Sequence, residues 1–235
     1  MYKDKRILAI IPARGGSKGI PHKNIINICD KPLIAYSIEA AQKSKYIDYV
    51  LVSTDDEEIK QVSLKYGAEV PFLRPEEISN DTAKSIDVVL HGLKYLEEHG
   101  NIFDYLVLLQ PTSPLRTYED IDEAIEVLME NKKDSLVSVC EAQENPVLMR
   151  IIDNERLRPF IEFKGDNLRR QDLPKFYIFN GALYINSVNM LINESVFVND
   201  NTMPFVMESN KSIDIDTMLD AKLVELILKE NDNGN

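Results

Sequence analysis

Short apolar runs alternate with amphipathic segments through about residue 140, and this alternation constrains the fold more than any other feature of the sequence. The runs that we expect to form buried strands are residues 6–13, 49–54, 68–73, 105–110 and 135–139. The segments with apolar side chains at helical spacing are residues 31–44, 55–67, 82–100 and 117–131. Strands that alternate with helices predict an α/β fold, a doubly wound and mostly parallel sheet with helices on both faces.

The pattern changes after residue 140. Mixed aromatic segments at 158–163 and 176–186 predict strands of an inserted, partly antiparallel element, and residues 217–230 predict a closing helix. The chain has 235 residues, 44% of them hydrophobic, which is enough to bury the core of one domain. We therefore predict a single domain, 1–235, with an inserted element at 141–210 that forms a lobe or a partner contact.

Charge and composition exclude several classes of partner. The net charge of −12 would repel a phosphate backbone, so we expect no nucleic-acid partner. No apolar run approaches the roughly 20 residues that span a bilayer, so we expect no membrane contact and a cytoplasmic location. Cys29 and Cys140 lack the spacing of a zinc or disulfide framework.

A glycine-rich loop, "ARGGSKGIPHKN", follows the first predicted strand. Ligands of parallel sheets bind beyond the carboxyl ends of the strands, and this loop leaves at that edge. Glycines let backbone N–H groups approach a polyanion, Arg14 can bind phosphate oxygens in a bidentate manner, and Lys18 and Lys23 add charge. The loop matches neither the Walker motif nor GxGxxG. It predicts a triphosphate cradle, and the alternative is a solvated basic turn.

A second motif, "SIDIDTMLD", contains Asp214 and Asp216. On an extended chain residues two apart face the same way, and paired carboxylate oxygens suit Mg²⁺. The alternative is that these acids cap the following helix. A basic cradle with paired carboxylates is typical of metal-assisted phosphoryl or nucleotidyl transfer.

Two further stretches carry polar groups. "LLQPTSPLR" places Gln110, Thr112 and Ser113 at the same sheet edge, or is only a rigid strand-to-helix connection. "RRQDLPKFYIFNGALYI" supplies groups that bind carboxylates and hydroxyls, the inventory for an acidic sugar: Arg169, Arg170, Gln171, Asn180 and Tyr184. The alternative for this stretch is an exposed turn that leads into a buried strand.

Taken together and in this order, these stretches, with "STDDEEI" and "LRPEEISNDTAKSI", resemble the acylneuraminate cytidylyltransferases, or CMP-sialic acid synthetases, and their relatives that act on legionaminic acid. The resemblance runs along nearly the whole chain. It implies a nucleotidyltransferase-type α/β fold, CTP as substrate, Mg²⁺ as cofactor, and a homodimer whose inserted element reaches over the partner's site.

The resemblance also implies residue roles. The residues expected around the CTP phosphates are Arg14, Ser17, Lys18, Lys23 and Asn24, with Arg74 and Ser85 helping to hold the nucleotide. The residues expected on the sugar are Gln110, Arg170, Gln171, Asn180 and Tyr184, with Phe197 in an apolar wall from the partner subunit. Asp214 and Asp216 would bind the metal, and the catalytic set would be Arg14, Lys18, Lys23 and Asp216.

The expected reaction joins CTP to a nine-carbon acidic 2-keto sugar, with N-acetylneuraminic acid as first choice, and releases pyrophosphate. Leu148 stands where some sialic-acid enzymes carry a lysine, which leaves legionaminic acid or another nonulosonic acid as the alternative. The eight-carbon acid Kdo fits less well, because its enzymes lack "SKGIPHKN" in this form. A non-catalytic nucleotide-binding regulator would not need both carboxylates.

Overall fold

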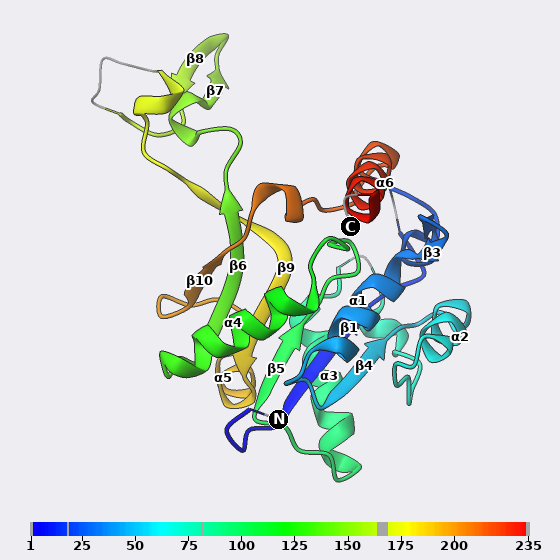
Figure 1. Ribbon diagram of the computed structural model, residues 1–235. Helices are drawn as coiled ribbons and strands as arrows, with labels where there is room; N and C mark the ends of the chain where they lie inside the picture. The colour runs from blue at the N-terminus through cyan, green and yellow to red at the C-terminus, as the bar shows by residue number, and fades with distance from the viewer. Residues whose placement is uncertain (1, 18, 81, 164–168, 234–235) are drawn as a thin grey trace.

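The computed structural model describes residues 2–17, 19–80, 82–163 and 169–233 (Figure 1). A six-stranded sheet in the order β10-β6-β9-β5-β1-β4 forms the centre of the molecule. Its strands in chain order are β1 Ile7–Pro12, β4 Tyr49–Ser53, β5 Tyr105–Leu108, β6 Ser135–Glu141, β9 Tyr177–Ser187 and β10 Met203–Val206. The pairs β1–β4, β1–β5 and β6–β10 are parallel, whereas β9 runs antiparallel to both β5 and β6.

Helices cover both faces of this sheet. One face packs against α1 Leu33–Lys43, α2 Glu57–Lys65 and α4 Tyr118–Glu130, and the other against α3 Ser85–Glu98 and α5 Val188–Glu194. Alternate residues of β1 pack on opposite faces of the sheet. Ile7 and Ile11 belong to the hydrophobic core on the first face, and Leu8 and Ile10 belong to the core on the second face. The prediction of a doubly wound, mostly parallel α/β sheet is therefore confirmed.

Two predicted strands are wrong in detail. Residues 68–73 form a single bridge, between Glu69 and Leu51, because Pro71 lacks the N–H group that would continue the ladder. The segment 158–163 contributes only its first two residues to a strand. That strand, β8 Arg156–Pro159, pairs with β7 Arg150–Asp153 across a turn with positive φ at Asn154 and Glu155.

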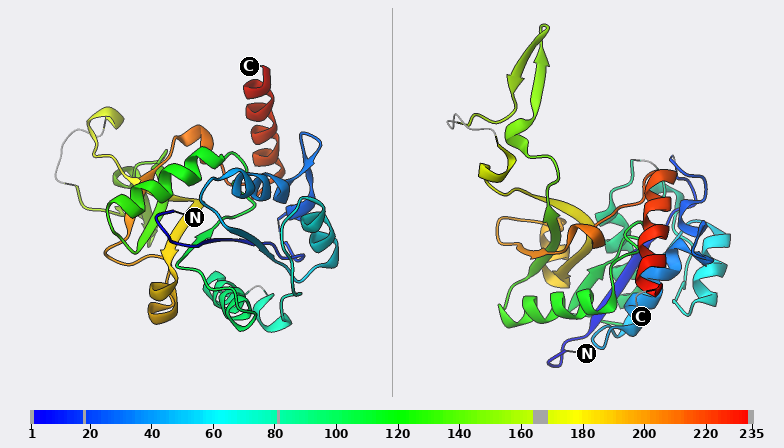
Figure 2. Two further views of the ribbon diagram at one scale, coloured as in Figure 1. Left: turned by 60° about the horizontal axis from the view of Figure 1, so that its bottom comes forward. Right: turned by 45° about the horizontal axis from the view of Figure 1, so that its top comes forward.

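The β7–β8 hairpin lies on an extension that leaves the sheet after β6 and returns at β9. We call its described residues, 142–163 and 169–176, the arm. The arm stands away from the rest of the molecule in Figure 1 and in the right view of Figure 2. It holds η3 Pro146–Leu148 and η4 Arg170–Asp172. The rest of the predicted insert, residues 177–210, contributes β9 and β10 to the central sheet.

The remaining elements are η1 Lys23–Ile25, the β2 Asn27–Ile28 and β3 Lys31–Pro32 hairpin, η2 Glu76–Ile78, η5 Ser209–Lys211 and the closing helix α6 Met218–Asn233. Lys211 of η5 pairs with Asp120 at the start of α4. Within the described residues no helix combines the length and apolar character needed to cross a membrane.

The strand order creates one position where ligands are expected. From β1 the chain first adds β4 on one side and then crosses back to add β5 on the other. Loops that leave β1 and β5 therefore diverge at their carboxyl ends, and such a switch point is where open α/β sheets bind ligands.

Candidate active site

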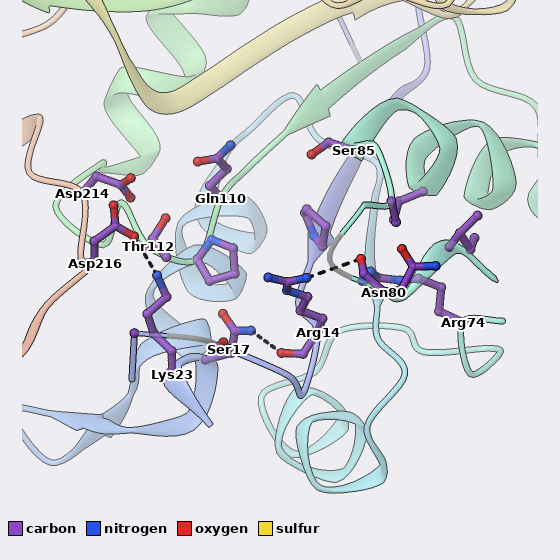
Figure 3. A pocket seen from close by; sticks show the side chains of 17 residues that line it. Arg14, Ser17, Lys23, Arg74, Asn80, Ser85, Gln110, Thr112, Asp214 and Asp216 are labelled. Atoms are coloured by element: carbon purple, nitrogen blue, oxygen red, sulfur yellow. Dashed lines mark hydrogen bonds and ion pairs between the residues drawn. The ribbon is translucent and has the colours of Figure 1, made fainter. Parts of the chain in front are cut away.

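A cleft of about 650 Å³ opens at this switch point (Figure 3). Its walls come from the loop after β1, residues 74–80 and 83–88, the loop after β5 and the segment before α6. The predicted site residues that line it are Arg14, Ser17, Lys23, Asn24, Arg74, Ser85, Gln110, Asp214 and Asp216. Segments from opposite ends of the chain, such as those of Arg14 and Asp216, thus meet in one cavity.

One end of the cleft carries two guanidinium groups. Arg74 is only 7% exposed, and its Nε donates to Ser53 Oγ at 3.2 Å. Arg14 Nη1 donates to the Asn80 carbonyl at 3.4 Å. Burial lowers the pKa of Arg74, the nearby charge of Arg14 lowers it further, and Asp55 opposes the shift. A bound anion would stabilise both cations, so this end of the cleft is suited to phosphate or another electron-rich group.

The glycine-rich loop is shaped by side chains around it. Asn24 Nδ2 donates to the Arg14 carbonyl at 2.9 Å, and Gly15 N donates to Asp55 Oδ1 at 3.0 Å. A Cβ atom on Gly19 would lie 2.7 Å from the Asp216 carbonyl oxygen, so only glycine allows this approach. The close approach brings the basic loop against the acidic segment.

The other end of the cleft is acidic. Lys23 Nζ binds Asp216 Oδ1 at 3.0 Å and the Ile215 carbonyl at 2.8 Å. Burial raises the pKa of Asp214, a hydrogen bond from Thr112 opposes this, and the charge of Asp216 adds to it. Two carboxylates therefore share one side of the cavity, with a lysine as counter-charge (Figure 3).

The alternative interpretation of this motif is that its acids cap the following helix. This holds for Asp220, not for Asp214 or Asp216. Asp220 Oδ2 accepts hydrogen bonds from Thr217 N at 2.7 Å and Asp216 N at 3.1 Å, at the start of α6. Because Asp220 satisfies these N–H groups, the side chains of Asp214 and Asp216 are left to line the cleft.

The acidic pair fits Mg²⁺ bound together with a substrate. Within the described residues no group of three or more His, Cys, Asp or Glu side chains could hold a metal ion by itself. Mg²⁺ usually takes one or two protein carboxylates and completes its octahedron with substrate phosphates and water. Asp214 and Asp216 in a cleft with basic residues offer that arrangement, and the cofactor stays a prediction.

The loop after β5 forms the wall nearest the sheet. Gln110 lies directly over Gly181 of β9, which has a φ of +73°, and a Cβ on Gly181 would be 2.7 Å from Gln110 Oε1. Ile215 N donates to the Thr112 carbonyl at 2.8 Å. The loop thus contacts both the strand beneath it and the acidic segment.

Of the other residues predicted to bind the sugar, none whose side chain the structure describes lines the cleft. Asn180 is buried and bonds to Ser138 and Ser212, and Tyr184 packs against Phe197 with ring centroids 5.7 Å apart. Gln171 lies on the arm, as does Leu148. Lys18 lies outside the described residues, and so does the side chain of Arg170. Their predicted roles stay predictions.

Asn80 also lines the cleft, although it was not singled out from the sequence. It follows η2 in a polar loop, inside the stretch "LRPEEISNDTAKSI" that carries the resemblance, but it was not among the predicted site residues. Its contact with Arg14 depends on how residues 74–80 fold back toward β1, which no local pattern encodes.

Comparison with known proteins agrees with this geometry. A family model described as cytidylyltransferase matches residues 8–201. A pseudaminic acid cytidylyltransferase of Campylobacter jejuni is 38% identical over 95% of this chain and 97% of that protein. A CMP-N,N'-diacetyllegionaminic acid synthase of Legionella pneumophila is 38% identical over 96% of this chain and 97% of that protein. An N-acylneuraminate cytidylyltransferase of Escherichia coli is 33% identical over 93% of this chain and 51% of that protein.

A solved structure shows the same fold. The structure of a CMP:2-keto-3-deoxy-manno-octonic acid synthetase complexed with CTP matches with a TM-score of 0.71 and 18% identity, over 96% of this chain and 99% of that one. The family model and the sequence relatives span most of the chain, and the cleft lies where the fold binds ligands. The chain therefore belongs to the cytidylyltransferase family of nucleotidyltransferase enzymes.

Proposed function

We propose that this enzyme joins CTP to a nine-carbon acidic 2-keto sugar. The anomeric hydroxyl oxygen of the sugar forms a bond to the α-phosphorus of CTP, the bond to the β-phosphate oxygen breaks, pyrophosphate leaves, and the hydroxyl proton is released. The observation that carries this proposal is the cleft itself, which has guanidinium groups at one end and paired carboxylates with Lys23 at the other.

Each group has a role in this reaction. Arg14 and Arg74 hold the nucleotide, and Lys23 places positive charge beside Asp216, where charge develops on the leaving pyrophosphate. Mg²⁺ held by Asp214 and Asp216 would supply Lewis-acid activation and charge shielding. The Lys23–Asp216 ion pair holds both side chains at the cleft.

The relatives favour a particular group of sugars. From the sequence, N-acetylneuraminic acid is the first choice. However, the N-acylneuraminate cytidylyltransferase is 33% identical to this chain, and the match covers only 51% of that protein. The pseudaminic acid and legionaminic acid enzymes are each 38% identical to this chain, and the match covers almost the whole length of those proteins. An apolar Leu148 would also suit a deoxygenated, methyl-bearing sugar better than a hydroxyl-rich one. We therefore propose legionaminic or pseudaminic acid as the substrate.

A substrate panel tests this proposal. Pyrophosphate release from CTP is measured in parallel with pseudaminic, legionaminic, N-acetylneuraminic and Kdo acids. We expect kcat/KM for one of the first two to exceed that for N-acetylneuraminic acid by at least about tenfold, the discrimination that a few pocket contacts provide. A preference for Kdo would contradict the sugar class. Binding of CTP without pyrophosphate release would contradict the reaction.

We further propose that the enzyme is a homodimer in which the arm covers the partner's cleft. Ile152 and Leu157 face each other across the β7–β8 hairpin and are 78% and 71% exposed. Other exposed apolar side chains on the arm are Met149, Ile151 and Phe160. Burial of one such side chain in an interface is worth about 1.5–3 kcal/mol. A projecting arm with these residues is therefore suited to a second copy of the chain.

Replacing the exposed pair tests the dimer. The double variant Ile152→Lys, Leu157→Glu keeps an opposite-charge pair across the hairpin but removes its apolar surface. We expect light scattering to show a shift from twice 26.9 kDa to 26.9 kDa. The control is Ile102→Glu, since Ile102 is also exposed but lies outside the arm, and it should remain dimeric. A wild-type enzyme that is monomeric and fully active would rule the dimer out.

A further inference from the structure

We propose that Arg116, which does not line the cleft, is a positioning residue that sets Gln110 at the sugar side of the active site. The proposal rests on the proposed function, in which Gln110 contacts the sugar. It assigns a role in the reaction to a residue that otherwise only ends the loop after β5.

The contacts of Arg116 join three segments. Its side chain is one of the largest that are fully buried, with 2% of the residue exposed. Nη1 donates to the Ala182 carbonyl at 2.9 Å and to the Gln110 carbonyl at 3.4 Å. Nη2 donates to Ser37 Oγ of α1 at 2.7 Å, and Ser37 Oγ in turn donates to the Gln110 carbonyl at 3.3 Å. The guanidinium group therefore holds the Gln110 backbone from two directions.

A buried charge at this position is costly for stability. No ion pair within 4.0 Å links Arg116 to an acid of the described residues, and Nε is buried without a hydrogen-bond partner. Burial lowers the pKa of Arg116 to about 10, and the charge of Asp120 opposes this. A fold with a buried charge that lacks a close counter-ion is less stable than the same fold with an apolar side chain of similar volume. What the guanidinium provides instead is a planar set of donors that fixes several acceptors at once.

The acceptors flank the contact between Gln110 and Gly181. Ala182 directly follows Gly181, whose Cα supports the Gln110 carboxamide with no room for a Cβ. Ser113 N also donates to the Gln110 carbonyl at 3.3 Å. Arg116 thus holds the Gln110 backbone and the Ala182 carbonyl at a fixed separation. A shift at Arg116 changes the position of Gln110 Oε1 but leaves the separate nucleotide end of the cleft in place.

Steady-state kinetics test the proposal. Arg116→Lys keeps a positive charge but loses the planar set of donors. We expect it to raise KM for the nine-carbon acid about tenfold and to change KM for CTP less than about twofold. In a Gln110→Ala background, the same substitution should add almost nothing, because residues that act through one another have non-additive effects. Equal increases in both KM values, or effects that multiply in the double variant, would overturn the proposal.

A second readout does not depend on activity. Leu128→Ala removes a fully buried side chain near the far end of α4 and serves as the control for lost stability. In ¹H–¹⁵N spectra, the Gln110 side-chain amide is identified by its absence in Gln110→Ala. We expect this signal to shift in Arg116→Lys and not in Leu128→Ala. An unmoved signal in Arg116→Lys would overturn the proposal, whereas a wild-type enzyme that uses no nine-carbon acid would contradict only the proposed function.

Discussion

Replacing Asp216 with Asn is expected to lower turnover at least about 100-fold while the fold is retained. The Asp216 side chain is 75% exposed, so loss of its charge removes little packing. It does remove the ion pair with Lys23 and one of the two carboxylates proposed to hold Mg²⁺. Pyrophosphate release at saturating CTP and sugar, measured across a Mg²⁺ titration, gives the turnover.

Asp220→Asn is the matched control for this substitution. It lies four residues away and accepts hydrogen bonds at the start of α6, outside the cleft. We expect it to lower the free energy of unfolding by about 1 kcal/mol and to leave turnover within a few-fold of wild type. Turnover near wild type in Asp216→Asn at saturating Mg²⁺ would contradict the metal assignment.

Replacing Arg170 with Ala is expected to raise KM for the sugar by about 100-fold or more and to leave KM for CTP nearly unchanged. A sugar carboxylate requires a cation, and a guanidinium can bind it in a bidentate manner. The backbone of Arg170 lies in η4 on the arm, which stands away from β1 and β5 of its own chain (Figure 1). Arg170 would therefore act on the partner's cleft in the proposed dimer. Equal increases in both KM values would show that the sugar site is elsewhere.

Combining the two variant chains in one dimer tests whether each active site is formed by the cleft of one chain and the arm of the other. When Asp216→Asn and Arg170→Ala chains are co-expressed in equal amounts, half of the dimers contain one of each. One of the two sites in such a dimer combines an intact cleft with an intact arm, so about a quarter of wild-type activity should return when the sugar is kept near the wild-type KM. Isolated mixed dimers without activity would show that each arm serves its own chain.

The sequence alone determined the body of the sheet and the character of its ligand edge. Apolar runs such as residues 6–13 are long and continuous enough to require burial, and amphipathic segments such as residues 117–131 carry their own capping signals. Arg14, Lys23 and Gln110 were predictable because each follows a strand, and strands of a parallel sheet end at one edge. These inferences need only local patterns.

Only the tertiary structure decided which of two similar local patterns reaches the cleft. Asp216 and Asp220 are both acids near the start of a helix, and the contact of Gly19 with Asp216 directs one toward Lys23 while the other caps α6. Asn180 and Tyr184 are polar residues on a strand whose neighbours were unknown, and the insertion of β9 between β5 and β6 buries Asn180 and packs Tyr184 against Phe197. Local periodicity specifies that a side chain is buried, but its neighbours depend on pairings between strands that are distant in sequence. For the same reason a lone arginine at the end of a loop gave no sign that Arg116 would bridge α1, the loop after β5 and β9.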